Sequence, residues 1–143
     1  NHSNTQFPDL SHATVGNDKV TSLLTDFSWI ENHFIPTVQK RGTAIIEARR
    51  GKSSAASAAN AIINHMQDWI FGTAQDNWVS MGVPSNGSYG IPSGVIFSFP
   101  VTCQNGQYKI VQGLEQSASD KEKMQKSYQE LISEQEAIKH LLK

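Results

Sequence analysis

The sequence predicts a fold of the α+β class, because its helical and strand signals occupy different stretches of the chain. Apolar residues recur at helical spacing from about residue 37 to residue 71. Strand and turn signals then fill residues 73–115, and one long amphipathic helix closes the chain. Within the strand region, Asn105-Gly106 between two apolar runs predicts a β-hairpin with a two-residue turn.

The first 36 residues give shorter signals. Residues 11–15 favour a short strand, and the Gly16-Asn17-Asp18 stretch after them favours a turn. Asp26 and Ser28 are candidate helix caps, because their side-chain oxygens can accept from backbone N–H groups of a first turn. Pro36 is predicted to open a new helix within its first turn.

The helical region is predicted to break in the middle. Arg50-Gly51-Lys52 interrupts the apolar pattern, Ser53 is a candidate cap for the next helix, and Gly72 is its predicted end. The second helix begins with small residues over 55–61, which let other backbone approach closely. This face has three open interpretations: packing on the sheet of the domain, on a nucleotide-binding domain, or on a second subunit.

The strand region and the last helix give more specific signals. Residues 78–81 alternate in side-chain size, and residues 95–102 have the composition of a buried strand. Ser119 and Glu122 have the spacing of a capping box, which predicts the start of the last helix. Its apolar stripe is interpreted as core packing, and its members are Met124, Tyr128, Leu131, Ile132, Ile138, Leu141 and Leu142.

Composition narrows the class of protein. A chain of 143 residues is long enough for one domain with a core of its own. The formal net charge of -1 argues against a nucleic-acid partner and an anionic membrane surface. No apolar run approaches the roughly 18 residues of a membrane span. Cys103 is the only cysteine, so no internal disulfide can form, and we expect it to be inert.

His2 is the first candidate for chemistry. It lies between two small polar residues, and Pro8 soon breaks any regular structure. A histidine with an ordinary pKa of about 6.5 can exchange a proton near neutral pH. A single histidine near a terminus is, however, usually an ordinary surface residue. The other histidines lack metal-ligand spacing, so no metal is predicted, and the sequence has no G-x-G-x-x-G dinucleotide fingerprint.

Four motifs, which follow one another along the chain, suggest a role for His2. Residues 1–9, Asn-His-Ser-Asn-Thr-Gln-Phe-Pro-Asp, resemble the active-site histidine segment of cytosolic-type malate dehydrogenases, read as G-N-H-S-x-T-Q-x-P-D. Three further stretches resemble the same family in the same order, and the likeness covers nearly the whole chain. They are Ile45–Arg49 with Ser53–Ala59, Trp78–Pro84, and Ser88–Pro92 with Phe97–Val101.

The resemblance implies roles for three residues. His2 would exchange a proton with the substrate oxygen while a hydride moves to or from a nicotinamide ring. Ser53 would contact the substrate and the nicotinamide amide, with Ser54 as the open alternative. Asn1 would help to shape the site. The Arg49-Arg50 pair is interpreted as solvated charge at a helix end, because the family's substrate arginines lie upstream.

The resemblance also implies a fold and a context. The fold would be α+β, with long helices packed on small twisted antiparallel sheets, and residues 1–143 would be the substrate-binding, catalytic C-terminal domain. The N-terminal Rossmann domain that binds most of the NAD would lie outside this sequence. The parent would be a cytoplasmic homodimer that interconverts malate and oxaloacetate, a step of the tricarboxylic acid cycle. Alternatives are a lactate dehydrogenase with the same body, acting on another 2-keto acid, and a catalytically silent fragment.

Overall fold

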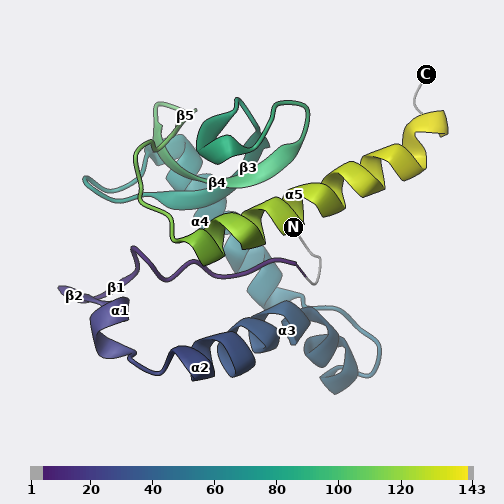
Figure 1. Ribbon diagram of the computed structural model, residues 1–143, viewed down its shortest axis with the longest axis horizontal. Coiled ribbons are helices and arrows are strands. Elements are labelled where there is room, and N and C mark those ends of the chain that lie inside the picture. Colours follow the sequence, from purple (N-terminus) through teal and green to yellow (C-terminus); the bar gives the residue numbers. More distant parts are fainter. Residues whose placement is uncertain (1–4, 142–143) are drawn as a thin grey trace. The chain divides into compact units, whose positions relative to one another are not determined.

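The computed structural model describes residues 5–141 and divides them into two compact units, with elements labelled in Figure 1. The helix unit comprises residues 5–53 and 116–127, and the sheet unit comprises residues 54–115 and 128–141. The boundaries fall in the connection before helix α4 (Ala56–Phe71), just before helix α5 (Ala118–Ile138) and within α5. Each unit is described by itself below.

The helix unit begins with a minimal β-hairpin. Strands β1 (Thr14–Val15) and β2 (Asp18–Lys19) pair antiparallel across a turn that contains Gly16. The turn lies where the sequence predicted one, whereas the strand predicted over residues 11–15 is limited to its last two residues. Three short helical segments and one longer helix follow. They are α1 (Val20–Leu23), α2 (Phe27–Trp29), the π-helical segment η1 (Ile30–Phe34) and α3 (Ile35–Ala48).

Two predicted helix signals are confirmed in this unit. The Asp26 carboxylate caps α2, because it accepts a hydrogen bond of 3.0 Å from the backbone N of Trp29. Pro36 lies in the first turn of α3, as predicted. The predicted break is also present, since α3 ends at Ala48 and a turn with Arg50 at φ 54° follows.

The sheet unit contains one three-stranded antiparallel sheet. Its strand order is β3 (Val79–Pro84), β4 (Ile96–Gln104) and β5 (Gln107–Ile110). The predicted turn joins β4 to β5, and both Asn105 and Gly106 have positive φ, at 50° and 74°. A 3₁₀ turn, η2 (Ser88–Gly90), lies between β3 and β4.

The core of the sheet unit lies on one face of this sheet. Alternate residues of β3 and β4 are buried, which is the two-residue period of a sheet with one covered face. The buried strand predicted over residues 95–102 is present on one face, where Val95, Phe99 and Val101 are buried, while alternate residues on the other face stay accessible. The buried apolar side chains of the unit are Met81, Val83, Ile91, Val95, Phe99, Val101, Cys103 and Ile110.

Helix α4 lies against β4 and β5 and ends at Gly72, as predicted. Figure 1 shows this helix beside the sheet. The hydrogen-bonded contact of this helix with the sheet, Trp69 with Gly106, lies near its C-terminal end, so the three interpretations of the small residues 55–61 stay open. No residue of α4 is in the buried class, and the helix exposes large apolar side chains. These are Ile62, Ile63, Met66, Ile70 and Phe71, which are 43–84% exposed.

Helix α5 corrects two predictions. Its capping box is Ser117 with Asp120, not Ser119 with Glu122: Asp120 N donates to Ser117 Oγ at 3.0 Å, and Ser117 N donates to the Asp120 carboxylate at 3.3 Å. The predicted core packing of its apolar stripe is only partly present: Met124, Tyr128, Leu131 and Ile132 are half-buried, whereas Ile138 is 48% exposed. A further 3₁₀ turn, η3 (Lys139–Leu141), follows.

The α+β prediction is confirmed at the level of elements, since helices accompany two small antiparallel sheets. Among the helices of residues 5–141, none combines the length and apolar character that crossing a membrane requires.

Candidate active site

The histidine motif enters the described part of the chain at Thr5. His2 and Asn1, two of the three predicted site residues, lie outside the described residues. The remainder of the motif, residues 5–9, belongs to the helix unit and is half-buried up to Pro8. The Asp9 carboxylate accepts a hydrogen bond of 2.8 Å from the backbone N of Ser11, which closes a local turn after Pro8.

Side chains from two helices hold this segment. Ser127 Oγ, on α5, donates to the carbonyl oxygen of Thr5 at 2.9 Å. Gln39 Nε2, on α3, donates to the carbonyl oxygen of Gln6 at 2.9 Å. The ammonium group of Lys123, on α5, lies 5.7 Å from the centroid of the Phe7 ring, within the range of a cation–π contact. Three consecutive residues of the motif are therefore held, Thr5 and Gln6 through their backbone carbonyls and Phe7 through its ring.

Ser53, the third predicted site residue, lies in the connection between α3 and α4 and is exposed. The prediction that Ser53 caps the second helix is wrong. The N-cap residue is Ala55, which has no side-chain oxygen to accept a hydrogen bond, and the helix begins at Ala56. A serine hydroxyl can both donate and accept a hydrogen bond, which a contact with a substrate or an amide would need.

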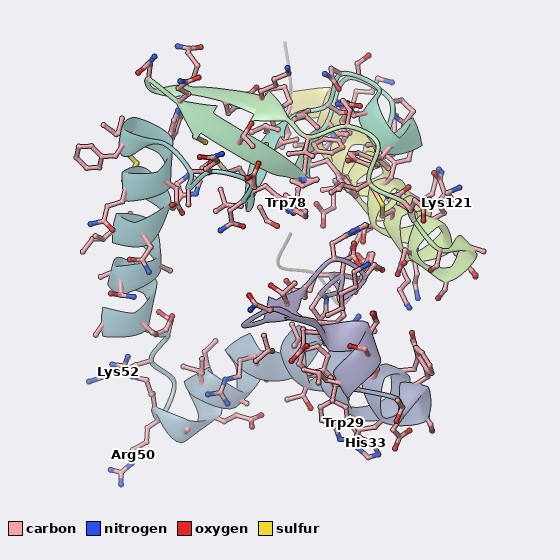
Figure 2. The ribbon with its side chains drawn as sticks, turned by 90° about the vertical axis from the view of Figure 1, so that its left-hand side faces the viewer. Trp29, His33, Arg50, Lys52, Trp78 and Lys121 are labelled. Carbon is pink, nitrogen blue, oxygen red and sulfur yellow. The ribbon has the colours of Figure 1, made fainter. Side chains whose placement is uncertain are left out.

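The charged residues beside Ser53 have the environment that the sequence suggested. Arg49 and Arg50 are exposed, and Figure 2 shows Arg50 and Lys52 pointing outward from the connection. Arg50 adopts the left-handed conformation at φ 54°, followed by Gly51 at φ 87°. Gly51 N donates to the carbonyl oxygen of Ile46 at 2.9 Å, which closes the end of α3 in the manner of a Schellman motif.

Ser127 and Gln39 were not among the residues that the sequence suggested. One signal could have found Ser127: it lies three residues after Met124 and four before Leu131, so a small polar residue interrupts the apolar stripe. A polar residue at such a position is informative, because buried hydroxyl groups need a hydrogen-bond partner. Gln39 gives no comparable signal, since a glutamine on a helix is ordinarily a solvated residue.

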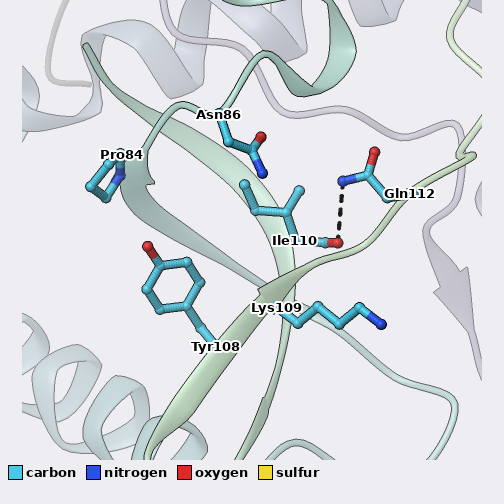
Figure 3. A pocket seen from close by; sticks show the side chains of 6 residues that line it. All are labelled: Pro84, Asn86, Tyr108, Lys109, Ile110 and Gln112. Atoms are coloured by element: carbon cyan, nitrogen blue, oxygen red, sulfur yellow. Dashed lines mark hydrogen bonds between the residues drawn. The ribbon is translucent and has the colours of Figure 1, made fainter. Parts of the chain in front are cut away.

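A shallow pocket of ≈ 340 Å³ lies on the sheet unit, and Figure 3 shows it from close by. It contains none of the predicted site residues. The amide of Gln112 already has partners within the protein, because its Nε2 donates to Ile110 O at 3.3 Å and to Ser88 Oγ at 2.9 Å. The pocket therefore offers little convergent chemistry. Its lining residues are Pro84, Asn86, Tyr108, Lys109, Ile110 and Gln112.

Two further results concern chemistry in the described residues. Burial raises the pKa of the Cys103 thiol above its ordinary value of 9.0, and the nearby Asp68 carboxylate raises it further. A buried thiol with a raised pKa is a poor nucleophile, which agrees with the interpretation of Cys103 as inert. Within residues 5–141, no group of three or more His, Cys, Asp or Glu side chains could hold a metal ion.

The fold and the motif define a class of protein: an α+β domain that carries a histidine segment at its start. Residues 1–142 match the family described as lactate/malate dehydrogenase, alpha/beta C-terminal domain. The chain belongs to this family, which confirms the resemblance inferred from the four motifs.

Solved structures agree with this assignment. A malate dehydrogenase of Naegleria fowleri is 48% identical over 99% of this chain, with a TM-score of 0.87. A lactate dehydrogenase of Trichomonas vaginalis, solved with NADH and oxamate, is 36% identical over 99% of this chain, with a TM-score of 0.86. A malate dehydrogenase of Plasmodium falciparum, at 17% identity and a TM-score of 0.83, supports the fold alone. The chain spans 43–45% of the length of these three proteins.

Proposed function

We propose that this chain is the substrate-binding, catalytic domain of an NAD-dependent malate dehydrogenase. The observation that carries the proposal is the histidine motif of residues 1–9 in a chain that is 48% identical to a malate dehydrogenase. The reaction would be the reversible transfer of a hydride between malate and oxaloacetate. Because the chain spans less than half the length of its relatives, the activity would belong to a longer molecule.

His2 is the proposed acid and base. In the direction of oxaloacetate reduction, the protonated imidazole donates a hydrogen bond to the keto oxygen and then transfers its proton to it. In the opposite direction, the neutral imidazole removes the proton of the malate hydroxyl. A carboxylate that orients the other ring nitrogen would lie upstream, since the family motif leads us to expect it before residue 1.

NAD would supply the hydride acceptor or donor when bound. The sequence contains no G-x-G-x-x-G fingerprint, so its phosphates and ribose would be held mainly by a Rossmann half outside this sequence. Ser53 fits a smaller role, because its exposed hydroxyl can donate to or accept from the nicotinamide amide or the substrate. Asn1 would help to shape the site beside His2.

We propose that the parent protein is a cytoplasmic homodimer and that its reaction belongs to the tricarboxylic acid cycle. The exposed apolar side of α4 supports association, because Ile62, Ile63 and Phe71 are 64%, 57% and 84% exposed. A second subunit and the nucleotide-binding half are the two candidates for covering it. The single cysteine and the absence of a basic field agree with a reducing compartment and with no nucleic-acid partner.

The second candidate is a lactate dehydrogenase. The Trichomonas vaginalis enzyme, 36% identical, carries that activity on a closely similar body. A positively charged residue in an upstream loop would pair with the second carboxylate of a dicarboxylic acid, and that loop is not part of this sequence. The third candidate is a catalytically silent domain that only folds and associates. It would apply to residues 1–143 expressed alone.

The test is NADH oxidation by the parent protein, with oxaloacetate and pyruvate offered separately. We expect turnover of oxaloacetate and its loss in His2→Asn, while His33→Asn, at an exposed histidine of the helix unit, keeps the rate. Turnover of pyruvate alone would replace the malate proposal by the lactate one. Undiminished activity in His2→Asn would remove the acid–base role from His2.

A further inference from the structure

We propose that Ser127 and Gln39 are positioning residues of the dehydrogenase reaction, because they fix the backbone from which His2 extends. This inference rests on the proposed function of His2, and its experiment separates the two. Neither residue touches substrate in this proposal. They act through the carbonyl oxygens of Thr5 and Gln6, which they hold at 2.9 Å each.

Ser127 is a buried polar residue whose hydroxyl bonds to the histidine segment. It is 5% exposed, in a helix whose other described residues are half-buried or exposed. A serine inside a helix ordinarily points to solvent or donates to the carbonyl one turn earlier. Here the hydroxyl donates to a carbonyl 122 residues away in the chain. Replacing the hydroxyl by hydrogen would remove this donor from the Thr5 carbonyl.

Gln39 supplies the second contact from another helix. It is half-buried on α3, and its amide crosses to the carbonyl of Gln6. The two donors thus hold adjacent peptide units from different elements of the same unit. Two hydrogen bonds on consecutive carbonyls restrict the backbone dihedrals between them, which a single hydrogen bond does not do.

A third contact fixes Phe7. Lys123 Nζ lies 5.7 Å from the ring centroid, and Glu31 Oε1 holds the same ammonium at 2.6 Å. Ser119 Oγ also accepts from it at 3.0 Å. Glu31 and Ser119 therefore hold the ammonium group at a fixed place beside the Phe7 ring. Pro8 follows and locks its own φ, which limits motion at the far end of the segment.

These contacts matter for catalysis because His2 is three residues from Thr5. Three residues of extended chain reach at most about 10 Å, so a pivot at Thr5 limits where the imidazole can go. A displacement of about 1 Å of a catalytic group can cost about 100-fold in rate. Loosening the pivot would therefore lower kcat more than it raises KM.

The experiment uses Ser127→Ala, Gln39→Met and their combination in the parent enzyme. Matched controls are Ser133→Ala and Gln125→Met, at exposed positions of α5. The readouts are kcat and KM for the 2-keto acid, and hydrogen–deuterium exchange of a peptide covering residues 1–9. We expect the double variant to lose about tenfold or more in kcat, with KM changing less than about threefold, and to exchange faster over residues 1–9. The controls should match the wild type.

Unchanged exchange over residues 1–9 in the double variant would overturn the proposal, because the two side chains would then not hold the segment. Faster exchange with unchanged kcat would also overturn it, since the contacts would be structural only. A parent enzyme that works equally well as His2→Asn would instead overturn the proposed function, and the positioning role with it. The two failures are distinguishable because the first leaves His2→Asn inactive.

Discussion

The indole N–H of Trp69 donates a hydrogen bond of 2.7 Å to the carbonyl oxygen of Gly106, 37 residues later in the chain. Trp69 lies near the end of α4, and Gly106 lies in the turn of the β4–β5 hairpin. The bond therefore links helix α4 to the three-stranded sheet. It is a tertiary contact that fixes the end of α4 within the sheet unit.

Trp69→Phe should destabilise the sheet unit by about 1 kcal/mol, because the Gly106 carbonyl loses its donor while most of the ring is kept. Urea unfolding followed by circular dichroism measures the change. The control is Trp29→Phe in the helix unit, where a phenyl ring can keep the stack on Phe34 at 5.6 Å. An equal loss in both variants would show that ring volume, not the hydrogen bond, matters.

Ser117→Ala should cost about 1 kcal/mol, because it removes the N-cap acceptor of α5. Ser119→Ala should cost much less, since Ser119 is exposed and its hydroxyl accepts from the Lys123 ammonium, not from a backbone N–H of the helix end. Thermal unfolding of the two variants side by side measures the difference. The opposite ranking would restore the capping box that the sequence alone suggested.

Gly72→Ala and Gly42→Ala should change stability in opposite directions. At Gly72, φ is 96° and an added Cβ would lie 3.0 Å from the carbonyl oxygen of Cys103. The variant is therefore strained both by its backbone conformation and by this close contact. At Gly42, inside α3, nothing lies within 4 Å of the added Cβ. Gly42→Ala should therefore stabilise by about 0.5–1 kcal/mol. Urea midpoints decide the signs, and a stabilising Gly72→Ala would contradict the close approach to Cys103.

The Cys103 thiol should make stability fall at alkaline pH. Its pKa is raised in the folded protein by burial and by Asp68, so the folded state retains the proton longer than the unfolded chain does. The contribution is fully present below the ordinary pKa of 9.0 and is lost as the pH rises toward the folded value.

Comparison with Cys103→Ala isolates this contribution from the other groups that titrate there. The difference in unfolding free energy between wild type and variant should narrow from pH 8 to pH 10, measured by urea unfolding at each pH. A constant difference over this range would mean that the thiol has the same pKa in the folded and unfolded states.

Local signals predicted the elements that depend on few residues. The Asn105-Gly106 hairpin, the Asp26 cap, Pro36 at a helix start and Gly72 at a helix end are all present. Each of these is decided by backbone conformations or hydrogen bonds within about four residues. Sequence spacing describes such interactions directly.

Errors arose where two local choices were nearly equal or where burial was involved. Ser117-Asp120 and Ser119-Glu122 both have the spacing of a capping box, and only the first forms. The terminal helix has helical apolar spacing, yet Ile138 and Leu141 are 48% and 68% exposed. A period identifies which side chains share a face, but it does not supply the partner that covers it.

Four ordered motifs were enough to predict the family and the candidate histidine, and local patterns predicted most element types. The groups that hold residues 5–7 could be identified only in the folded chain. The contacts of Ser127 with Thr5 and of Gln39 with Gln6 join residues 122 and 33 positions apart. Such pairs depend on how helices pack around the segment. A donor and a carbonyl that are distant in the chain leave no periodic or spacing signal.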